Sequence, residues 1–231
     1  MAPSTTPSWR SSWREGTDRL RGAFRGLPTV TRAALLTLGA SYVLFLVLAM
    51  LIEGGWPVLE HWLALTPNRV HLRPWSLITM ALLHRDPMHL LFNVLALWSL
   101  GPHVERSLGG RPYGILMLAS TLGGSLLYAL TGLLLQPGTP AIGASGGILG
   151  VLCAFALLFP RSELQFFFAG RMAARHLPWV LLGVDLILRL AGMPIAVFAH
   201  VGGMIGAWAY LRRPWTPGGR QQIRRFLDRI R

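Results

Sequence analysis

The sequence predicts an all-α membrane protein with about six transmembrane helices, and three observations support this fold class. Of its 231 residues, 52% are hydrophobic and only 13% are charged, about half the charged fraction of a typical soluble domain. The mean hydropathy is positive. Between Arg111 and Arg161, 49 consecutive residues include no charged residue and no His. At about 20 apolar residues per crossing, this stretch holds two spans. The segment 136–140, Gln-Pro-Gly-Thr-Pro, provides the turn between them.

The first predicted span covers about 33–52, between Arg32 and Glu53. The connection after it, about 54–86, is rich in Trp, Pro and His. This mixture of aromatic and polar residues favours a first outer loop that is partly inserted into the membrane interface. Five later spans are expected at about 87–104, 112–135, 145–159, 177–191 and 195–211. The predicted architecture is therefore a six-transmembrane-helix bundle.

The arginines determine the predicted orientation. If the N-terminus is inside, 18 of the 22 Arg lie in inner segments and three lie in outer connections. This bias predicts that both termini are cytoplasmic, most simply in a bacterial inner membrane. Residues 1–32 are then an Arg-rich cytoplasmic tail, 33–212 the membrane domain and 213–231 a basic cytoplasmic tail. Part of this last tail, 221–231, is able to form a surface helix.

The net charge of +13 flanks apolar spans, so it is assigned to topology and to contact with anionic membrane lipid. Nucleic acid is not an expected partner. The Arg-rich start is poor in acidic residues and faintly resembles a mitochondrial transit peptide, but a cytoplasmic tail is preferred. The single Cys153 excludes an intrachain disulfide framework.

Four polar residues are predicted to lie at one depth in the outer part of the bilayer. The second, fourth and sixth spans all run from outside to inside. His89 and Asn93 lie near the start of the second span, Ser145 at the start of the fourth and His200 near the start of the sixth. Polar side chains inside spans are expensive and usually functional. A hydroxyl, two imidazoles and a carboxamide at one level are suited to acyl transfer.

Ser145 lies in the small-residue segment Gly143-Ala144-Ser145-Gly146-Gly147. Its hydroxyl is expected at the N-cap of the following helix. Free backbone N–H groups and the positive end of the helix dipole would stabilise an oxyanion there. The glycines would let the backbone and a substrate approach closely. Without the other polar residues, the same segment is more simply a helix cap.

His200 is followed by a Gly202-x-x-x-Gly206 face, and the fourth span carries a Gly146-x-x-x-Gly150 face. Such faces permit close helix packing in lipid. If the fourth and sixth spans pack through these faces, His200 reaches Ser145, for which a neutral imidazole is a suitable base. The alternative for His200 is an interhelical hydrogen bond. His89 and Asn93, four residues apart, share one helix face and can donate to a common anion, or else form a polar packing contact.

The remaining polar residues do not indicate a metal site, a cofactor or a third catalytic group. His84 and His89 are five residues apart and are expected on different faces, with only Asp86 nearby, so no metal is predicted. Asp185 and Arg189 are four apart on the fifth span and are expected to pair with each other. No carboxylate then remains for a triad, and a Ser–His dyad is predicted.

Together these motifs resemble the rhomboid family of intramembrane serine proteases, over about residues 74–207. The segments that carry the resemblance, in order along the chain, are Trp75-Ser76-Leu77-Ile78-Thr79, His84-Arg85-Asp86-Pro87-Met88-His89-Leu90-Leu91-Phe92-Asn93, Glu105-Arg106-Ser107-Leu108-Gly109, Gly143-Ala144-Ser145-Gly146 and Ala199-His200-Val201-Gly202-Gly203.

The resemblance implies a six-helix core with a water-accessible cavity open to the outside. No cofactor or metal is expected. It implies Ser145 as nucleophile and His200 as general base and acid. It further implies an oxyanion hole of His89, Asn93 and the Ser145 N–H, supported by Gly143 and Gly146. The implied substrates are single-span membrane proteins, cleaved in or near a destabilised part of their transmembrane segment.

Two positions depart from the family pattern: Ser76 stands where many members have Arg, and Leu149 where many have an aromatic that packs on the catalytic His. Among other functions, a non-catalytic rhomboid-like protein that binds membrane clients is the main alternative. Such relatives are expected to lack the Ser or the His, and this chain has both. A transporter would more naturally show inverted repeats, and none is found. The natural substrate and the oligomeric state are left open.

Overall fold

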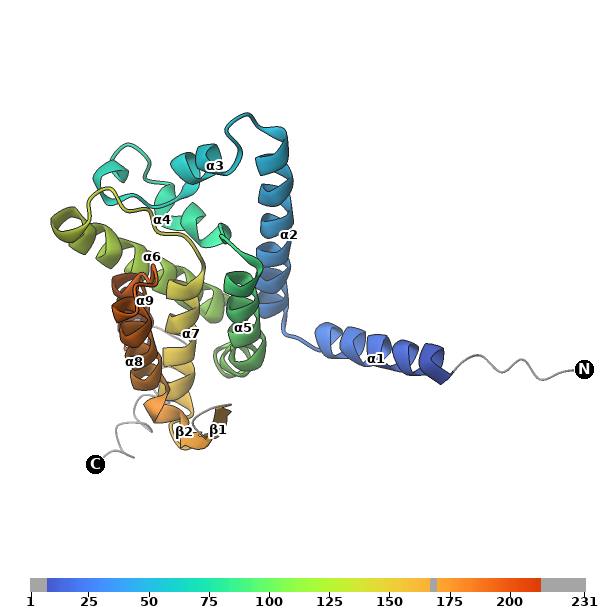
Figure 1. Cartoon of the computed structure of the whole chain (residues 1–231). Coiled ribbons are helices and arrows are strands. Elements are labelled where there is room, and N and C mark those ends of the chain that lie inside the picture. Colours follow the sequence, from blue (N-terminus) through green and yellow to red (C-terminus); the bar gives the residue numbers. More distant parts are fainter. Residues whose placement is uncertain (1–7, 167–169, 213–231) are drawn as a thin grey trace, which may run out of the picture.

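The computed structural model describes residues 8–166 and 170–212, and this part of the chain is mostly helical (Figure 1). The helices are α1 (Ser8–Arg25), α2 (Thr29–Leu51), α3 (Gly55–Leu63), α4 (Ser76–Thr79), α5 (Pro87–Leu108), α6 (Gly110–Leu135), α7 (Ser145–Leu158), α8 (Leu177–Leu190) and α9 (Val197–Leu211). Short 3-10 turns are η1 (Pro67–Arg69), η2 (Met80–Leu82) and η3 (Ala174–His176). The strands β1 (Glu163–Phe166) and β2 (Gly170–Ala173) form an antiparallel hairpin.

Each segment predicted as a span forms a helix, α2 and α5 to α9, with ends within a few residues of those expected. By length and composition, α2 and α6 are long and apolar enough to cross a membrane, and α7 and α9 are shorter apolar helices. The predicted 1–32 tail contains α1, which was not expected. The helix suggested at 221–231 lies outside the described residues.

The expectation of an all-α chain is wrong between α7 and α8. Glu163 pairs in register with Ala173, and Phe166 with Gly170, in the β1–β2 hairpin. Exposed Arg171 and Glu163 form an ion pair across the two strands. Two four-residue strands in a polar connection give too short a periodic pattern to be distinguished from a loop.

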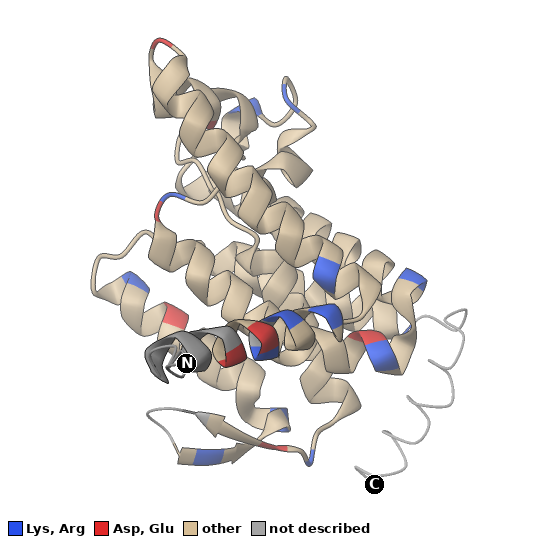
Figure 2. Cartoon of the chain, turned by 90° about the vertical axis from the view of Figure 1, so that its right-hand side faces the viewer, with Lys and Arg blue, Asp and Glu red and all other residues tan. Residues whose placement is uncertain are grey.

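The long helices form a bundle with a different set of short elements at each of its two ends (Figure 1). Helices α3 and α4 cover one end, the β1–β2 hairpin lies at the other, and α1 extends away from the bundle. In Figure 2 the Arg, Asp and Glu residues lie mainly toward the two ends and on α1, and most of the ribbon between them is uncharged. The position of the charges is thus consistent with an apolar layer between two polar levels.

Glycines bring α9 into backbone contact with both α6 and α7. A Cβ at Gly203 would lie within 1.9 Å of the Gly146 carbonyl oxygen, and one at Gly146 would lie 3.0 Å from the Ala199 oxygen. Gly202 and Gly206 face α6 instead, against the backbones of Gly123 and Ala119. The prediction that α7 and α9 pack closely is therefore right, but the α9 face involved is that of Gly203, and the Gly202–Gly206 face packs on α6.

A buried carboxylate joins α2 to α5. Glu105 is 4% exposed and accepts hydrogen bonds from the backbone N–H groups of Val30 and Thr31 at 2.9 and 2.7 Å. The Thr31 hydroxyl donates to the same carboxylate at 2.7 Å. Because Pro28 precedes α2 and offers no side-chain cap, Glu105 supplies the acceptor that the first turn of α2 needs.

The first connection, 54–86, packs over the segment that leads into α7. Leu65 and Ala141 exchange two backbone hydrogen bonds, and the Gly143 N–H donates to the Met80 carbonyl at 2.8 Å. Buried Ser76, at the position where the resemblance leads one to expect Arg, has no hydrogen-bond partner for its hydroxyl among the described residues. Arg73 supplies the internal bonding instead: it donates to the His61 carbonyl and lies over the Trp62 ring at 5.0 Å.

Replacing Glu105 with Ala is expected to lower the free energy of unfolding by about 2–4 kcal/mol, because two backbone donors and a hydroxyl would be left buried without an acceptor. Glu163→Ala is the matched control, since its ion pair with Arg171 is exposed and contributes little. Thermal unfolding in detergent micelles measures both. Equal melting temperatures for the two variants would contradict the role given to Glu105.

Candidate active site

Ser145 is the first residue of α7, and Ala144 occupies the N-cap position. The prediction that Ser145 itself is the N-cap is therefore wrong by one residue. The difference matters, because the Ser145 hydroxyl is not used to cap its own helix and stays available for another partner. Its backbone N–H belongs to the first turn, where amides have no intrahelical acceptor. The first amide that bonds back to the N-cap is that of Ile148, which donates to the Ala144 carbonyl.

His200 lies one turn into α9 with its ring beside Ser145. The distance from Ser145 Oγ to His200 Nε2 is 2.7 Å, a hydrogen bond between residues 55 apart in the sequence. The bond exists because the Ala199 carbonyl packs on Gly146, the residue after Ser145. The sequence-based prediction that these two residues meet agrees with this geometry. The structure thus brings together a hydroxyl and an imidazole at the N-terminus of a helix.

Asp185 provides the second partner of the imidazole, contrary to expectation. Its Oδ2 lies 2.5 Å from His200 Nδ1, and its residue is 9% exposed on the inward face of α8. Arg189, expected to pair with Asp185, is exposed, and no ion pair joins the two in the described chain. The arginine side chain is long enough to extend toward a polar boundary, whereas the short carboxylate reaches only the buried imidazole. His200 therefore has a hydrogen-bond partner at each ring nitrogen.

His89 and Asn93, predicted as oxyanion donors, lie on α5 but have additional neighbours. The His89 ring packs against Gly143, where a Cβ would lie 2.5 Å from its ring atoms. Asp86 caps α5 by accepting from the His89 N–H at 2.9 Å. Asn93 is 5% exposed, and its Nδ2 donates to His84 Nε2 at 2.9 Å. That bond uses one of the two carboxamide hydrogens and leaves the other for a further acceptor.

His84 contacts both His89 and Asn93, although its five-residue separation from His89 predicts that the two histidines lie on different faces. It precedes α5, so helical faces do not apply to it, and its ring meets the His89 ring edge-on with centroids 5.0 Å apart. Burial, together with repulsion from His89, lowers the pKa of His84 from 6.5 to about 4. His84 is therefore neutral near pH 7, and its Nε2 is free to accept the hydrogen bond from Asn93.

Gly143 connects the first connection, 54–86, to the segment that carries Ser145. Its φ of +109° is a conformation that other residues rarely adopt, and its N–H is held by the Met80 carbonyl. The absence of a side chain leaves the space that the His89 ring fills. Gly143 and Gly146, both predicted as supporting residues, thus serve different contacts: Gly143 accommodates α5, and Gly146 accommodates α9.

Leu149, where the resemblance leads one to expect an aromatic ring against His200, is a half-buried residue of α7. An aliphatic side chain cannot stack on an imidazole. In this chain the His200 ring instead has a hydrogen-bond partner at each nitrogen, Ser145 and Asp185. Both its position and its orientation are therefore defined without an aromatic neighbour.

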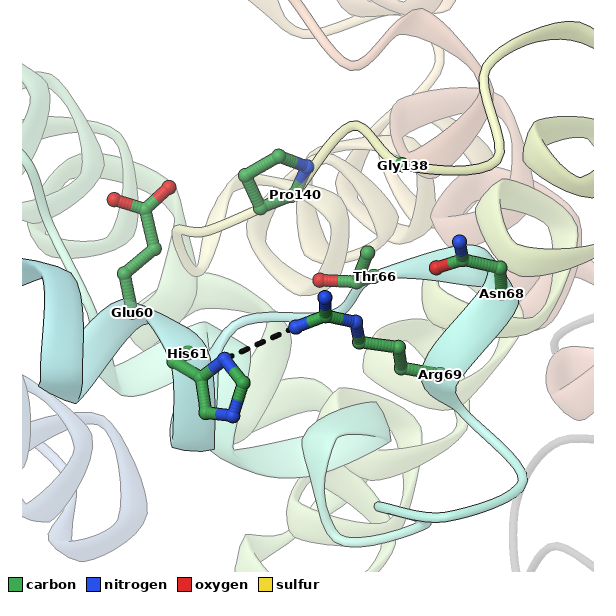
Figure 3. Close-up of a pocket in the computed structure, with 7 residues that line it drawn as sticks. All are labelled: Glu60, His61, Thr66, Asn68, Arg69, Gly138 and Pro140. Carbon is green, nitrogen blue, oxygen red and sulfur yellow. Dashed lines mark hydrogen bonds between the residues drawn. The ribbon is translucent and has the colours of Figure 1, made fainter.

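A separate pocket of about 190 Å³ lies among α3, η1 and the α6–α7 connection (Figure 3). Its lining residues are Glu60, His61, Thr66, Asn68, Arg69, Gly138 and Pro140. Arg69 donates to His61 Nδ1 across it at 3.0 Å. It contains none of the residues around Ser145, so it is not part of the candidate site.

Comparison with known protein families gives a match to the rhomboid domain over residues 71–213. This chain belongs to the rhomboid family. The match spans more than half of the chain and includes α5 to α9 with every predicted site residue. Rhomboid family members are membrane proteins, so the chain is one as well.

Curated relatives of this rhomboid include proteases. The "Rhomboid protease GluP" of Bacillus subtilis is 34% identical over 134 residues, which cover 58% of this chain and 25% of the relative. The "Rhomboid protease GlpG" of Pectobacterium atrosepticum is 30% identical over 75% of this chain and 60% of the relative. "Rhomboid protein 1, mitochondrial" of Saccharomyces cerevisiae is 35% identical over 48% of this chain and 33% of the relative. The chain therefore spans between about a quarter and three fifths of the length of these relatives.

Two polar residues of the rhomboid site escaped the sequence reasoning. Asp185 was assigned to Arg189 on helical spacing alone, although a carboxylate facing the bundle could have been matched to the imidazole on the next span. His84 belongs to one of the segments that carry the resemblance and is also weighed as a metal ligand, but its hydrogen bond with Asn93 is not expected from the sequence. For Asp185 the missing information is which helices are neighbours, and for His84 it is that the residue precedes α5 and does not share its helical spacing.

The lowered pKa of His84 predicts that acid destabilises the fold. Between about pH 6.5 and pH 4 the unfolded chain binds a proton at His84 that the folded chain does not, so stability is lost as the pH falls through this window, by up to about 3 kcal/mol. His84→Gln should lose less stability than wild type over this window. The unfolding free energy, measured by denaturant titration at several pH values, tests this.

His176→Gln is the control, because His176 is exposed and its replacement should leave the pH dependence unchanged. If His84→Gln and wild type lose stability equally between pH 6.5 and 4, then His84 is not the group that titrates.

Proposed function

We propose that this rhomboid is an intramembrane serine endopeptidase that uses Ser145 and His200 to hydrolyse peptide bonds of other membrane proteins. The observation that carries the proposal is the 2.7 Å contact between Ser145 Oγ and His200 Nε2 at the start of α7. A hydroxyl bonded to an imidazole, with unbonded backbone amides beside it, is the arrangement that acyl transfer requires. The protease names of several relatives support the same activity.

In the proposed reaction, Ser145 Oγ attacks the substrate carbonyl carbon as its proton passes to His200 Nε2. The negative charge that develops on the carbonyl oxygen is received by the Ser145 N–H, with His89 and Asn93 as side-chain donors. The imidazolium then gives its proton to the leaving nitrogen as the C–N bond breaks. Water attacks the acyl-enzyme, its proton passes to His200, and Ser145 Oγ leaves with that proton.

We further propose that α2 and α5 to α9 all cross the membrane, with both termini in the cytoplasm and the site in the outer half of the bilayer. The bacterial inner membrane is the proposed location, supported by the arginine distribution. Some relatives are mitochondrial, such as the one from yeast, so family membership does not distinguish the bacterial from the mitochondrial membrane. The proposed location therefore rests on the arginine distribution.

The proposed substrates are single-span membrane proteins with a weak helix near the outer surface. Carbonyl groups within a regular helix are already hydrogen-bonded, and the substrate must unwind before Ser145 can attack one of them. A Gly or Pro close to the cleavage position reduces the free energy required for unwinding. A substrate with a continuous strong helix is therefore expected to be cut slowly.

The decisive experiment compares wild type, Ser145→Ala and His200→Ala, each reconstituted in liposomes with a single-span substrate that contains Gly near its outer end. Wild type should cleave, and each variant should lose at least about 1,000-fold in kcat. Folding of every variant is checked by thermal unfolding. A folded wild type that cuts no member of a substrate panel would overturn the proposal in favour of non-catalytic client binding, and cutting by Ser145→Ala would implicate another nucleophile.

Gly143→Ala is expected to reduce kcat by about 100-fold with a smaller effect on KM, because the new Cβ would displace the His89 ring from the oxyanion position and would strain a positive φ. Gly138→Ala is the matched control, since no atom lies within 4 Å of its added Cβ. Kinetics with the same liposome substrate compare the two. Equal activity of both variants would show that His89 does not need its observed position.

A further inference from the structure

Asp185 is a buried carboxylate on α8 whose neighbours along the chain are exposed apolar residues. Its neighbours Val184, Leu186 and Ile187 are 41%, 54% and 67% exposed, whereas Asp185 itself is 9% exposed. On α8, only Leu177 and Asp185 are buried. A carboxylate at this depth is unfavourable unless it has a partner, and an ionisable residue inside a membrane segment indicates function by default.

The partner of Asp185 is the nitrogen of His200 that Ser145 does not use. Asp185 Oδ2 lies 2.5 Å from Nδ1, and Ser145 Oγ lies 2.7 Å from Nε2 of the same ring. Both side chains of the Asp185–His200 pair are largely buried, at 13% and 10% exposure. Three residues from α7, α9 and α8 therefore form one continuous chain of hydrogen bonds through the imidazole.

We infer that Asp185 is a positioning residue that completes a Ser145–His200–Asp185 triad in this rhomboid. An ionised carboxylate only accepts hydrogen bonds, so it requires the proton of the neutral imidazole to reside on Nδ1. Nε2 then carries the lone pair that accepts the Ser145 proton. When the proton has moved, the carboxylate stabilises the imidazolium at close range and remains ionised itself. This inference rests on the proposed function.

The alternative is that Asp185 only pairs with Arg189 or fills space. Arg189 is one helical turn further along α8 and exposed, so the two explanations separate experimentally. Removing the charge of Asp185 at constant size affects the triad, whereas removing the charge of Arg189 affects only the alternative pair. The matched variants are therefore Asp185→Asn, Asp185→Glu and Arg189→Gln.

Kinetics of the full chain in liposomes, with the Gly-containing single-span substrate, measure kcat, KM and the pH profile. Asp185→Asn should lower kcat about 100- to 10,000-fold with KM within about twofold of wild type. The pH profile of kcat/KM should also differ from that of wild type, because the carboxylate no longer stabilises the ring once it has accepted the Ser145 proton. Asp185→Glu should recover part of kcat, and Arg189→Gln should match wild type. In a His200→Ala background, Asp185→Asn should cause no further loss.

A second measurement does not depend on turnover. NMR of the protein with ¹⁵N-labelled His in micelles reports which ring nitrogen of His200 is protonated, after assignment through His200→Ala. Wild type should carry the proton on Nδ1, and Asp185→Asn should lose this preference. This readout also applies to wild type alone if Asp185→Asn does not fold.

The outcomes separate the two proposals. If wild type cleaves, and Asp185→Asn retains kcat within threefold with an unchanged pH profile, the triad is refuted and the Ser145–His200 function stands. If Arg189→Gln reproduces the loss seen in Asp185→Asn, the pair with Arg189 is the correct explanation. A proton on Nε2 of wild-type His200 also refutes the triad. If wild type neither cleaves substrate nor reacts at Ser145 with a fluorophosphonate probe, both proposals fail together.

Discussion

Helix α9 lies in backbone contact with α6 and α7 because glycines on all three helices leave no side chain between them. Gly203 faces the Gly146 carbonyl, and Gly202 faces Gly123. In a lipid environment helices gain little from the hydrophobic effect when they associate, so close van der Waals contact has to stabilise the bundle. This contact also fixes how far α9 is shifted along α7. As a result, His200, which follows Ala199, lies beside Ser145, which precedes Gly146. A single added methyl group at Gly203 would separate the helices by more than a hydrogen bond tolerates.

The buried polar groups of the candidate site are partners for one another. An unpaired polar group in an apolar environment is unfavourable by several kcal/mol, so each one needs a partner within the bundle. His200 has a partner at each ring nitrogen, and Asn93 has His84. The Asn93–His84 pair and the His200–Asp185 pair differ in electrostatic character. The pair on the α5 side is neutral and presents donors, whereas the pair on the α8 side can carry one positive and one negative charge. Under the proposed function, the Asn93 side offers a donor for the oxyanion and His200 offers the base for the Ser145 hydroxyl.

The sequence was informative where a pattern is long or where a residue is out of place in lipid. Long, mainly apolar runs located α2 and α5 to α9, and the polarity of Ser145 and His200 inside such runs identified the pair that the structure joins. The hairpin between α7 and α8 was missed because four-residue strands have no lasting period. The partner of Asp185 and the role of His84 were missed for another reason. Local spacing indicates which residues share a helix face, but contacts between helices depend on their rotation and neighbours, which one sequence does not specify.

The three helices of the hydrogen-bonded chain are not held equally firmly. Helices α7 and α9 bury nine and seven residues and meet through glycines, whereas α8 buries only two of its 14 residues. The Ser145–His200 contact is therefore fixed by the core of the bundle, and the Asp185–His200 contact depends on where α8 rests. A shift of α8 by about 1–2 Å would break a hydrogen bond of 2.5 Å and leave the contact at Ser145 unchanged. Within the proposed triad, the orientation of the imidazole proton therefore depends on the packing of α8, which buries few of its residues.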